Sequence, residues 1–262
     1  MYLTKKENKL SEDFMRDGYL ILKTNEMESL NFIRGYIEGL IYKKISRTKK
    51  NKNILNEFHK YINMNEINNL RLDFIKRLNS ESKFRLSYFD IAKFILYDIV
   101  GNELAMQTNI NLSIQLPKDK SSLLPVHADT WAGDSPYEIV VWIPLVDCYK
   151  TKSMYILPQQ KAQQITDNFK SISGQTAKDF YNNIEKDLEW LNIPFGHILI
   201  FNQSLPHGNV VNIEEETRWS MNCRFKSVFS PYGDKKLGEF FEPITLRAAS
   251  RIGMSYKYPK IK

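Results

Sequence analysis

The pattern of apolar residues changes near Gly101, and this change limits the folds that the chain can adopt. Before that point apolar residues recur at helical spacing, most clearly over residues 26–43. After it, short segments rich in Ile, Val and aromatic residues are bounded by Pro, Gly, Asn or Asp, as is typical of strands. Helices first and strands afterwards predict an α+β protein, with N-terminal helices packed on one sheet of a double-stranded β-helix (a jelly-roll or cupin-like fold).

The same periodicities predict the individual segments. Helices are expected over residues 11–17, 26–43, 54–78, 87–99 and 176–191, with a basic loop over 47–53. Strands are expected over residues 19–22, 108–115, 137–146, 153–157, 197–201, 209–213 and 218–228. One domain over 1–262 is expected, with helical support over 1–105, a jelly-roll core over 106–228, a helical insert at about 174–191, and an extension over 229–262. The sequence leaves open whether that extension covers the site as a lid.

Composition excludes several classes of protein. Of the 262 residues 42% are hydrophobic, which is ample for a buried core. Two cysteines, Cys148 and Cys223, cannot build a disulfide scaffold or a zinc module. The first residues show no apolar signal segment, and no apolar run reaches the roughly 18 residues of a membrane helix. The expected compartment is therefore the reducing cytoplasm, without a membrane span.

The net charge of +7 is compatible with a nucleic-acid partner. However, the basic runs at residues 47–52 and 150–152 are short, and no zinc or RNA-binding motif accompanies them. We therefore interpret the charge as ordinary surface solvation and expect a small-molecule substrate with no nucleic acid. The oligomeric state is not encoded in any feature that we recognise.

Two histidines and an aspartate form a candidate metal site. His127 and Asp129 are two residues apart, so that in extended backbone their side chains point to the same face. His207 lies near a later predicted strand. Two His and one carboxylate are the facial triad of non-heme Fe(II) enzymes, which leaves metal positions open for other ligands.

An arginine and a serine follow the second histidine. Arg218 and Ser220 are two residues apart on the next predicted strand and therefore share one face. A guanidinium fork beside a hydroxyl suits a carboxylate, because bidentate charge-assisted hydrogen bonds are strong and directional. A dicarboxylate that chelates a metal at one end would need such an anchor at the other.

Taken in this order, the motifs resemble the Fe(II)- and 2-oxoglutarate-dependent oxygenases of the phytanoyl-CoA dioxygenase-like superfamily. The resemblance covers most of the chain, including GYLIL, VHADTW, IVVWIPLVD, SMYILPQQ and PFGHILIFNQSLPHGN. Thr151-Lys152 stands where the superfamily often has an acidic-Asn-Gly turn. The segments WAGDSPYE, KTKSMY, NQSLPHGN and FFEPITLRAASRIGMSY are most similar to oxygenases of carbohydrate and aminoglycoside (streptomycin-type) biosynthesis clusters.

The resemblance implies a mechanism. His127, Asp129 and His207 would bind Fe(II), and Arg218 with Ser220 would hold the distal carboxylate of 2-oxoglutarate. With O₂ as the other co-substrate, the 2-oxo acid would give succinate and CO₂ while the organic substrate is oxidised. Because Asp129 is present, hydroxylation or a related oxidation is expected rather than halogenation. The implied substrate is a sugar, free or nucleotide-linked, or another sugar-containing small molecule.

Further residues are candidates for the same site, each with a structural alternative. Trp142 and Gln115 are candidates for the co-substrate pocket. The alternative for Trp142 is packing in the core, and the alternative for Gln115 is an exposed or core-edge position. Trp131, Asn222 and Arg224 are candidates for substrate binding. The alternative for Trp131 is packing against other side chains, and the alternative for Arg224 is a structural ion pair.

Three alternative functions remain open from the sequence. One is an oxygenase of another small metabolite, such as an amino-acid derivative or an acyl thioester. The others are a nucleic-acid or protein demethylase and a metal-binding barrel without oxygenase activity.

Overall fold

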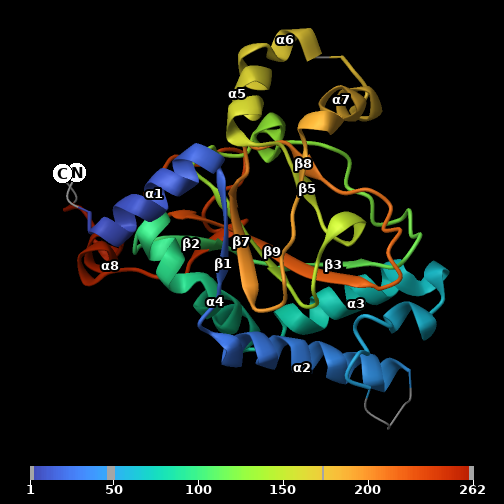
Figure 1. Cartoon of the computed structure of the whole chain (residues 1–262). Helices are drawn as coiled ribbons and strands as arrows, with labels where there is room; N and C mark the ends of the chain where they lie inside the picture. Colours follow the sequence, from blue (N-terminus) through green and yellow to red (C-terminus); the bar gives the residue numbers. More distant parts are fainter. Residues whose placement is uncertain (1–2, 46–50, 173, 260–262) are drawn as a thin grey trace.

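The computed structural model describes residues 3–45, 51–172 and 174–259 (Figure 1). Its α-helices are α1 (Lys5–Asp17), α2 (Met27–Lys44), α3 (Ile67–Asn79), α4 (Phe84–Ile99), α5 (Gln159–Asp167), α6 (Phe169–Ile172), α7 (Ala177–Ile184) and α8 (Ala248–Ser255). Its 3₁₀ turns are η1 (Phe58–Lys60), η2 (Met64–Glu66), η3 (Asp129–Ala132), η4 (Lys150–Lys152) and η5 (Glu185–Asp187). Its strands are β1 (Tyr19–Lys23), β2 (Leu104–Gln107), β3 (Asn111–Gln115), β4 (Ile139–Pro144), β5 (Tyr155–Ile156), β6 (Glu189–Trp190), β7 (His197–Asn202), β8 (His207–Gly208), β9 (Arg218–Ser227) and β10 (Phe241–Pro243).

The strands form two antiparallel sheets. The large sheet has the order β1-β7-β4-β9-β2-β10, with β3 paired to the first half of β9. The small sheet has the order β6-β5-β8. Helices α2, α3 and α4 lie along one side of the large sheet (Figure 1). The arrangement therefore has the two sheets and the supporting helices that the sequence predicts.

Strand β9 separates the helical core from the opposite side of the large sheet. Trp219 is fully buried on the helical side, where its ring contacts Phe58 and Phe74 and its indole nitrogen donates to the carbonyl of Leu55. Because side chains alternate along a strand, the residues on either side of Trp219 project from the other face. Four alternate residues of β9 on that face line a cavity, namely Arg218, Ser220, Asn222 and Arg224.

The first helix is longer than the predicted 11–17, because it begins at Lys5, and the first strand lies where the sequence predicts it. Thr4 caps α1 through a reciprocal pair of hydrogen bonds with Glu7, which is a capping box. Gly18 ends the helix in the left-handed conformation at φ 76°, where glycine carries no Cβ penalty. Strand β1 then pairs with β7 at the edge of the large sheet.

The single helix predicted over residues 54–78 is wrong in its first half. Two 3₁₀ turns, η1 and η2, precede α3, which begins only at Ile67. Asparagine side chains compete with helical hydrogen bonds here: Asn51 accepts from the backbone of Asn53, and Asn63 caps η2. Residues 46–50, which hold most of the predicted basic loop, lie outside the described residues.

Two strand predictions also need correction. The strand expected over 108–115 is two strands, β2 and β3, because Asn79 at the end of α3 binds both backbone groups of Ile110 between them. The strand expected over 209–213 is absent from the described structure. Asn209 instead uses its side chain to bind backbone groups of Ser122 and Leu124.

The insert and the C-terminal extension differ from expectation in extent. The insert begins at α5, before residue 174, and projects beyond β5 and β8 (Figure 1). Its helix predicted over 176–191 ends at Ile184, where η5 and then strand β6 follow. The extension adds β10 to the large sheet beside β2 and ends in α8, which has no buried residue. In the described part of the chain, no helix is long and apolar enough to cross a lipid bilayer.

The indole of Trp219 provides a test of this packing. We expect Trp219→Phe to lower the free energy of unfolding by roughly 1–3 kcal/mol, because the buried donor to Leu55 is lost. The measurement is urea denaturation followed by circular dichroism. Trp190→Phe is the control, since Trp190 is 37% exposed, and should change stability by less than about 0.5 kcal/mol. Equal losses in the two variants would contradict the assigned core.

Candidate metal centre and carboxylate pocket

A backbone bridge places the two candidate histidines side by side. The amide of His127 donates to the carbonyl of His207 at 3.1 Å, and the amide of His207 donates back at 2.9 Å. The two imidazole rings consequently lie 4.4 Å apart, measured between centroids. Residues 80 positions apart in the chain therefore meet through an antiparallel bridge, a pairing that the sequence did not predict.

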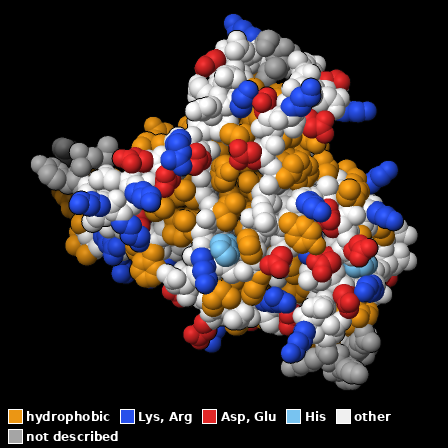
Figure 2. Space-filling model, viewed as in Figure 1, with side chains coloured by type: hydrophobic (Ala, Val, Ile, Leu, Met, Phe, Trp, Pro, Cys, Tyr) orange, Lys and Arg blue, Asp and Glu red, His pale blue; other side chains and the backbone are white. Residues whose placement is uncertain are grey.

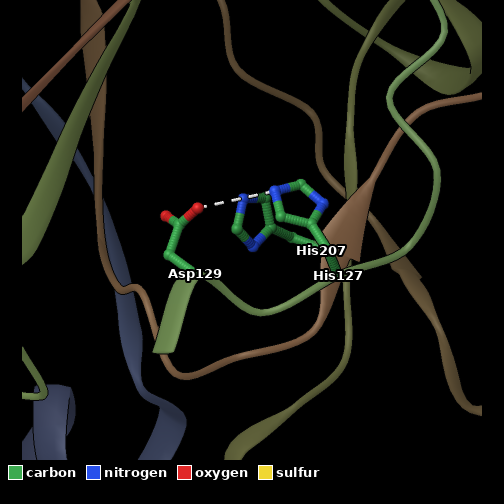
Figure 3. Close-up of side chains that lie close together, drawn as sticks. All are labelled: His127, Asp129 and His207. Carbon is green, nitrogen blue, oxygen red and sulfur yellow. Dashed lines mark ion pairs between the residues drawn. The ribbon is translucent and has the colours of Figure 1, made fainter. Parts of the chain in front are cut away.

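Extended backbone brings Asp129 to the same place. Ala128 has φ −117° and ψ 133°, so that His127 and Asp129 point to one face, as their spacing predicts. The amide of Asp129 is fixed by the carbonyl of Gln203 at 3.0 Å. Its Oδ1 atom lies 3.5 Å from Nε2 of His127 (Figure 3).

The three side chains offer a donor set that suits a metal ion. One ligand atom from each of His127, Asp129 and His207 lies within 4.8 Å of the others. Nδ1 of His127 contacts the Pro125 carbonyl at 2.8 Å, and Nδ1 of His207 contacts the Leu205 carbonyl at 2.9 Å. Such contacts fix the ring orientation of metal-binding histidines and leave Nε2 for the ion. Two imidazoles and one carboxylate fit Fe(II) with open positions.

The surroundings favour the metal-binding forms of His207 and Asp129, whereas at His127 they favour the protonated form. Burial lowers the pKa of His207 to about 4, so that this imidazole is neutral. Burial raises the pKa of Asp129, but the neighbouring His127, His207 and Arg224 outweigh that effect and lower it overall. Burial likewise opposes the charge on His127, but the hydrogen bond to Asp129 and the other contacts raise its pKa.

A cavity of about 470 Å³ adjoins the three side chains. Arg218 forms part of its wall and is only 3% exposed. The guanidinium donates from Nη1 to the carbonyl of Ser153 at 2.9 Å and from Nη2 to Oγ of Ser113 at 3.0 Å. Among the described residues, no carboxylate pairs with Arg218, and its Nε has no hydrogen-bond partner. Burial without an anion lowers the pKa of Arg218 to about 10.

Ser220 shares this unsatisfied state. It is 1% exposed, lines the cavity, and its Oγ has no hydrogen-bond partner among the described residues. A buried cation without a counter-ion and a buried hydroxyl without a hydrogen-bond partner cost folding free energy, and an anion in the cavity would satisfy both. The arrangement can therefore bind a carboxylate of a molecule that reaches the metal centre.

Two of the further candidates lie on the cavity wall. Trp142 on β4 and Asn222 on β9 face each other across the strand pair and both line the cavity. Asn222 accepts a hydrogen bond from the side chain of Asn111 at 2.9 Å. Trp142 is only 5% exposed, so its side chain packs in the core and also lines the cavity.

Gln115 and Trp131 are not among the cavity-lining residues. Gln115 is fully buried opposite Arg218, and its amide donates to the carbonyl of Val210 at 2.7 Å. Trp131 is 38% exposed, and its ring contacts Phe169 and Phe180 of the insert. Gln115 was a candidate because of its place on a strand, and Trp131 because it follows His127-x-Asp129. Neither position in the sequence reveals that each side chain contacts a neighbouring segment of the chain instead.

Arg224 lines the cavity but already forms ion pairs. Its Nη2 lies 2.9 Å from Oδ1 of Asp129, and its Nη1 lies 2.7 Å from Oδ2 of Asp134. The ion-pair alternative is therefore the one observed. Lys152, which lies in the basic run at 150–152, is not a solvated surface cation, because it is fully buried against Glu216 and Asn56.

Sequence reasoning missed several residues around the site. Asp134 and Ser113 hold Arg224 and Arg218 respectively, and Arg71 of α3 forms another part of the cavity wall. Ser113 stands directly opposite Ser220 in the β3–β9 register, so correct strand pairing would have found it. Arg71 comes from a helix, and no local motif signals its position.

Solved structures with the same fold were found by structural comparison. The apo form of the non-heme monooxygenase ThoJ superposes with a TM-score of 0.60 at 14% identity, covering 91% of this chain and 84% of that one. AviO1 from Streptomyces viridochromogenes Tue57 gives a TM-score of 0.53 at 12% identity, covering 88% of this chain and 100% of that one. No protein-family model matches the chain, and a search of curated proteins gave no match. The likenesses confirm the predicted α+β double-stranded β-helix.

Proposed function

We propose that this protein is an Fe(II)- and 2-oxoglutarate-dependent oxygenase that hydroxylates or oxidises a sugar or a sugar-containing small molecule. One observation carries the proposal: the buried, unpaired Arg218 lines the same cavity as His127, Asp129 and His207. A metal triad alone would suit many barrels. A separate carboxylate anchor in the same cavity is what a chelating 2-oxo acid requires.

Each residue has a distinct task in this proposal. His127, Asp129 and His207 would hold Fe(II), which with O₂ and 2-oxoglutarate supplies the oxidising chemistry. Arg218 and Ser220 would bind the carboxylate of 2-oxoglutarate that is remote from the metal. Trp142 would border the co-substrate, and its apolar ring would limit the access of water. The structure of ThoJ, which has this fold, includes a form solved with nickel, and that supports a metal at this centre.

The proposed substrate class rests on the sequence resemblance and on the cavity wall. Uncharged polar side chains line much of the cavity, namely Asn111, Ser113, Ser121, Ser122, Asn209 and Asn222. Amide and hydroxyl groups both donate and accept hydrogen bonds, as recognition of a polyhydroxylated molecule requires. A cavity of about 470 Å³ has the size expected of a site for small molecules.

The charge distribution supports a small-molecule substrate over a nucleic acid. On the face shown in Figure 2, Lys and Arg side chains are interspersed with Asp and Glu. Nucleic-acid binding is favoured by cations gathered on one face or along one groove. On this face, the cations that contribute to the net charge of +7 are thus accompanied by acidic side chains.

Product analysis tests the proposal. Purified protein with Fe(II), 2-oxoglutarate and O₂ is expected to form succinate, and sugars or nucleotide-linked sugars should accelerate it. Amino-acid derivatives and acyl thioesters form the comparison panel. Succinate formation accelerated only by that panel would reject the sugar substrate. The absence of O₂-dependent succinate with every compound would reject the oxygenase itself.

A further inference from the structure

Arg224 joins the candidate metal ligand Asp129 to a second buried carboxylate. Its two terminal nitrogens contact different partners, Nη2 with Asp129 at 2.9 Å and Nη1 with Asp134 at 2.7 Å. The side chains of Arg224, Asp129 and Asp134 are 16%, 12% and 3% exposed, so solvent screens these contacts little. The planar guanidinium therefore fixes one carboxylate relative to the other.

The C-terminal extension contacts Asp134, the second carboxylate that Arg224 binds. Lys235 lies 2.6 Å from Oδ2 of Asp134, the same oxygen that Arg224 contacts. Both cations also lie near the ring of Phe240, with Cζ of Arg224 at 5.7 Å and Nζ of Lys235 at 4.9 Å from its centroid. Asp134 is thus neutralised from two directions by groups that come from β9 and from the segment after it.

Two glycines allow the extension to approach this closely. A Cβ on Gly133 would clash with the carboxylate of Asp234, and Gly133 has φ +92°. A Cβ on Gly233 would clash with the carbonyl oxygen of Gly133 and would lie 2.8 Å from the amide of Ser135. The amide of Asp234 donates to that carbonyl at 3.1 Å. Backbone contact therefore sets the position of Lys235 beside Asp134.

We propose that Arg224 is a positioning residue, which Asp134 and Lys235 hold so that Asp129 presents its carboxylate to the metal ion. The inference rests on the proposed metal centre and adds a task for the C-terminal extension. Oδ1 of Asp129 contacts Arg224 and also faces His127, so the guanidinium limits rotation of the carboxylate. Groups that hydrogen-bond a metal ligand commonly account for 10–100-fold in metal affinity.

Co(II) binding to the full-length protein tests this inference. Arg224→Met is expected to weaken Co(II) affinity by roughly 10–100-fold and to change the visible Co(II) spectrum, which reports ligand geometry. Arg224→Lys keeps the charge but cannot bridge two carboxylates, so its affinity should lie between those of Arg224→Met and the wild type. Wild-type affinity in either variant would overturn the inference, and Arg224→Lys keeps the test valid if Arg224→Met does not fold.

A double-mutant cycle tests the path through Asp134. Asp134→Asn alone should weaken Co(II) binding, whereas adding it to Arg224→Met should cause no further loss, because Asp134 acts through Arg224. Additive losses would overturn that path. Arg34→Met is the matched control, since Arg34 pairs with Glu38 on α2 and should leave Co(II) affinity unchanged.

His127→Ala separates this inference from the proposed function. Retained Co(II) binding in His127→Ala would reject the metal centre itself. Loss of binding in His127→Ala together with wild-type affinity in Arg224→Met would reject only the task assigned to Arg224.

Discussion

Replacing His127 by alanine is expected to abolish Fe(II) binding and O₂-dependent succinate formation. His127 supplies one of three ligand atoms within 4.8 Å, and its Nδ1 contact with Pro125 directs Nε2 toward Asp129. Alanine leaves two ligands, and no other His, Cys, Asp or Glu in the described part of the chain completes the group. Isothermal titration with Fe(II) under anaerobic conditions measures the binding, and chromatography measures succinate.

His197→Ala is the matched control for this loss. His197 lies at the start of β7 and is not a member of the ligand group, so Fe(II) binding should match the wild type. Asp129→Ala and His207→Ala should reproduce the loss seen in His127→Ala. Persistence of both Fe(II) binding and succinate release in His127→Ala would refute the assigned centre.

Replacing Arg218 by methionine is expected to remove 2-oxoglutarate binding while sparing the folded protein. Removal of one partner of a buried charge pair costs roughly 2–5 kcal/mol, or about 30- to 4,000-fold in affinity. Without ligand, Arg218 is a buried cation that no described carboxylate neutralises, so its removal should not lower the melting temperature. Calorimetry with 2-oxoglutarate and Ni(II), and thermal denaturation, give the two measurements.

Arg85→Met is the control for Arg218→Met. Arg85 also donates to backbone carbonyls, those of Met106 and Thr108 among them, but it does not line the cavity. Its loss should lower stability and leave 2-oxoglutarate affinity unchanged, the reverse of Arg218→Met. Unchanged 2-oxoglutarate affinity in Arg218→Met would count against the oxygenase mechanism.

Local spacing was sufficient for several features of the candidate site. The two-residue interval in His127-x-Asp129 places both side chains on one face because the intervening residue is extended. The same rule places Arg218, Ser220, Asn222 and Arg224 on the cavity side of β9. These predictions depend only on the alternation of side chains along extended backbone.

Spacing could not show which partner each side chain meets. Gln115 and Arg224 both lie on strands at the expected places, yet Val210 engages the first and two carboxylates engage the second. Asparagine-rich residues 51–65 have helical spacing, but side-chain hydrogen bonds to the backbone replace half of the predicted helix by turns.

The sequence by itself determined the fold class, the three candidate metal ligands and the alternation that carries Arg218 and Ser220. Only the tertiary structure decided that Arg218 is buried without an anion and that Arg224 is engaged by Asp129 and Asp134. The physical reason is the range of the forces involved. Alternation and capping act between near neighbours, whereas burial and charge pairing depend on segments such as 133–135 and 231–235 that meet only in the folded chain.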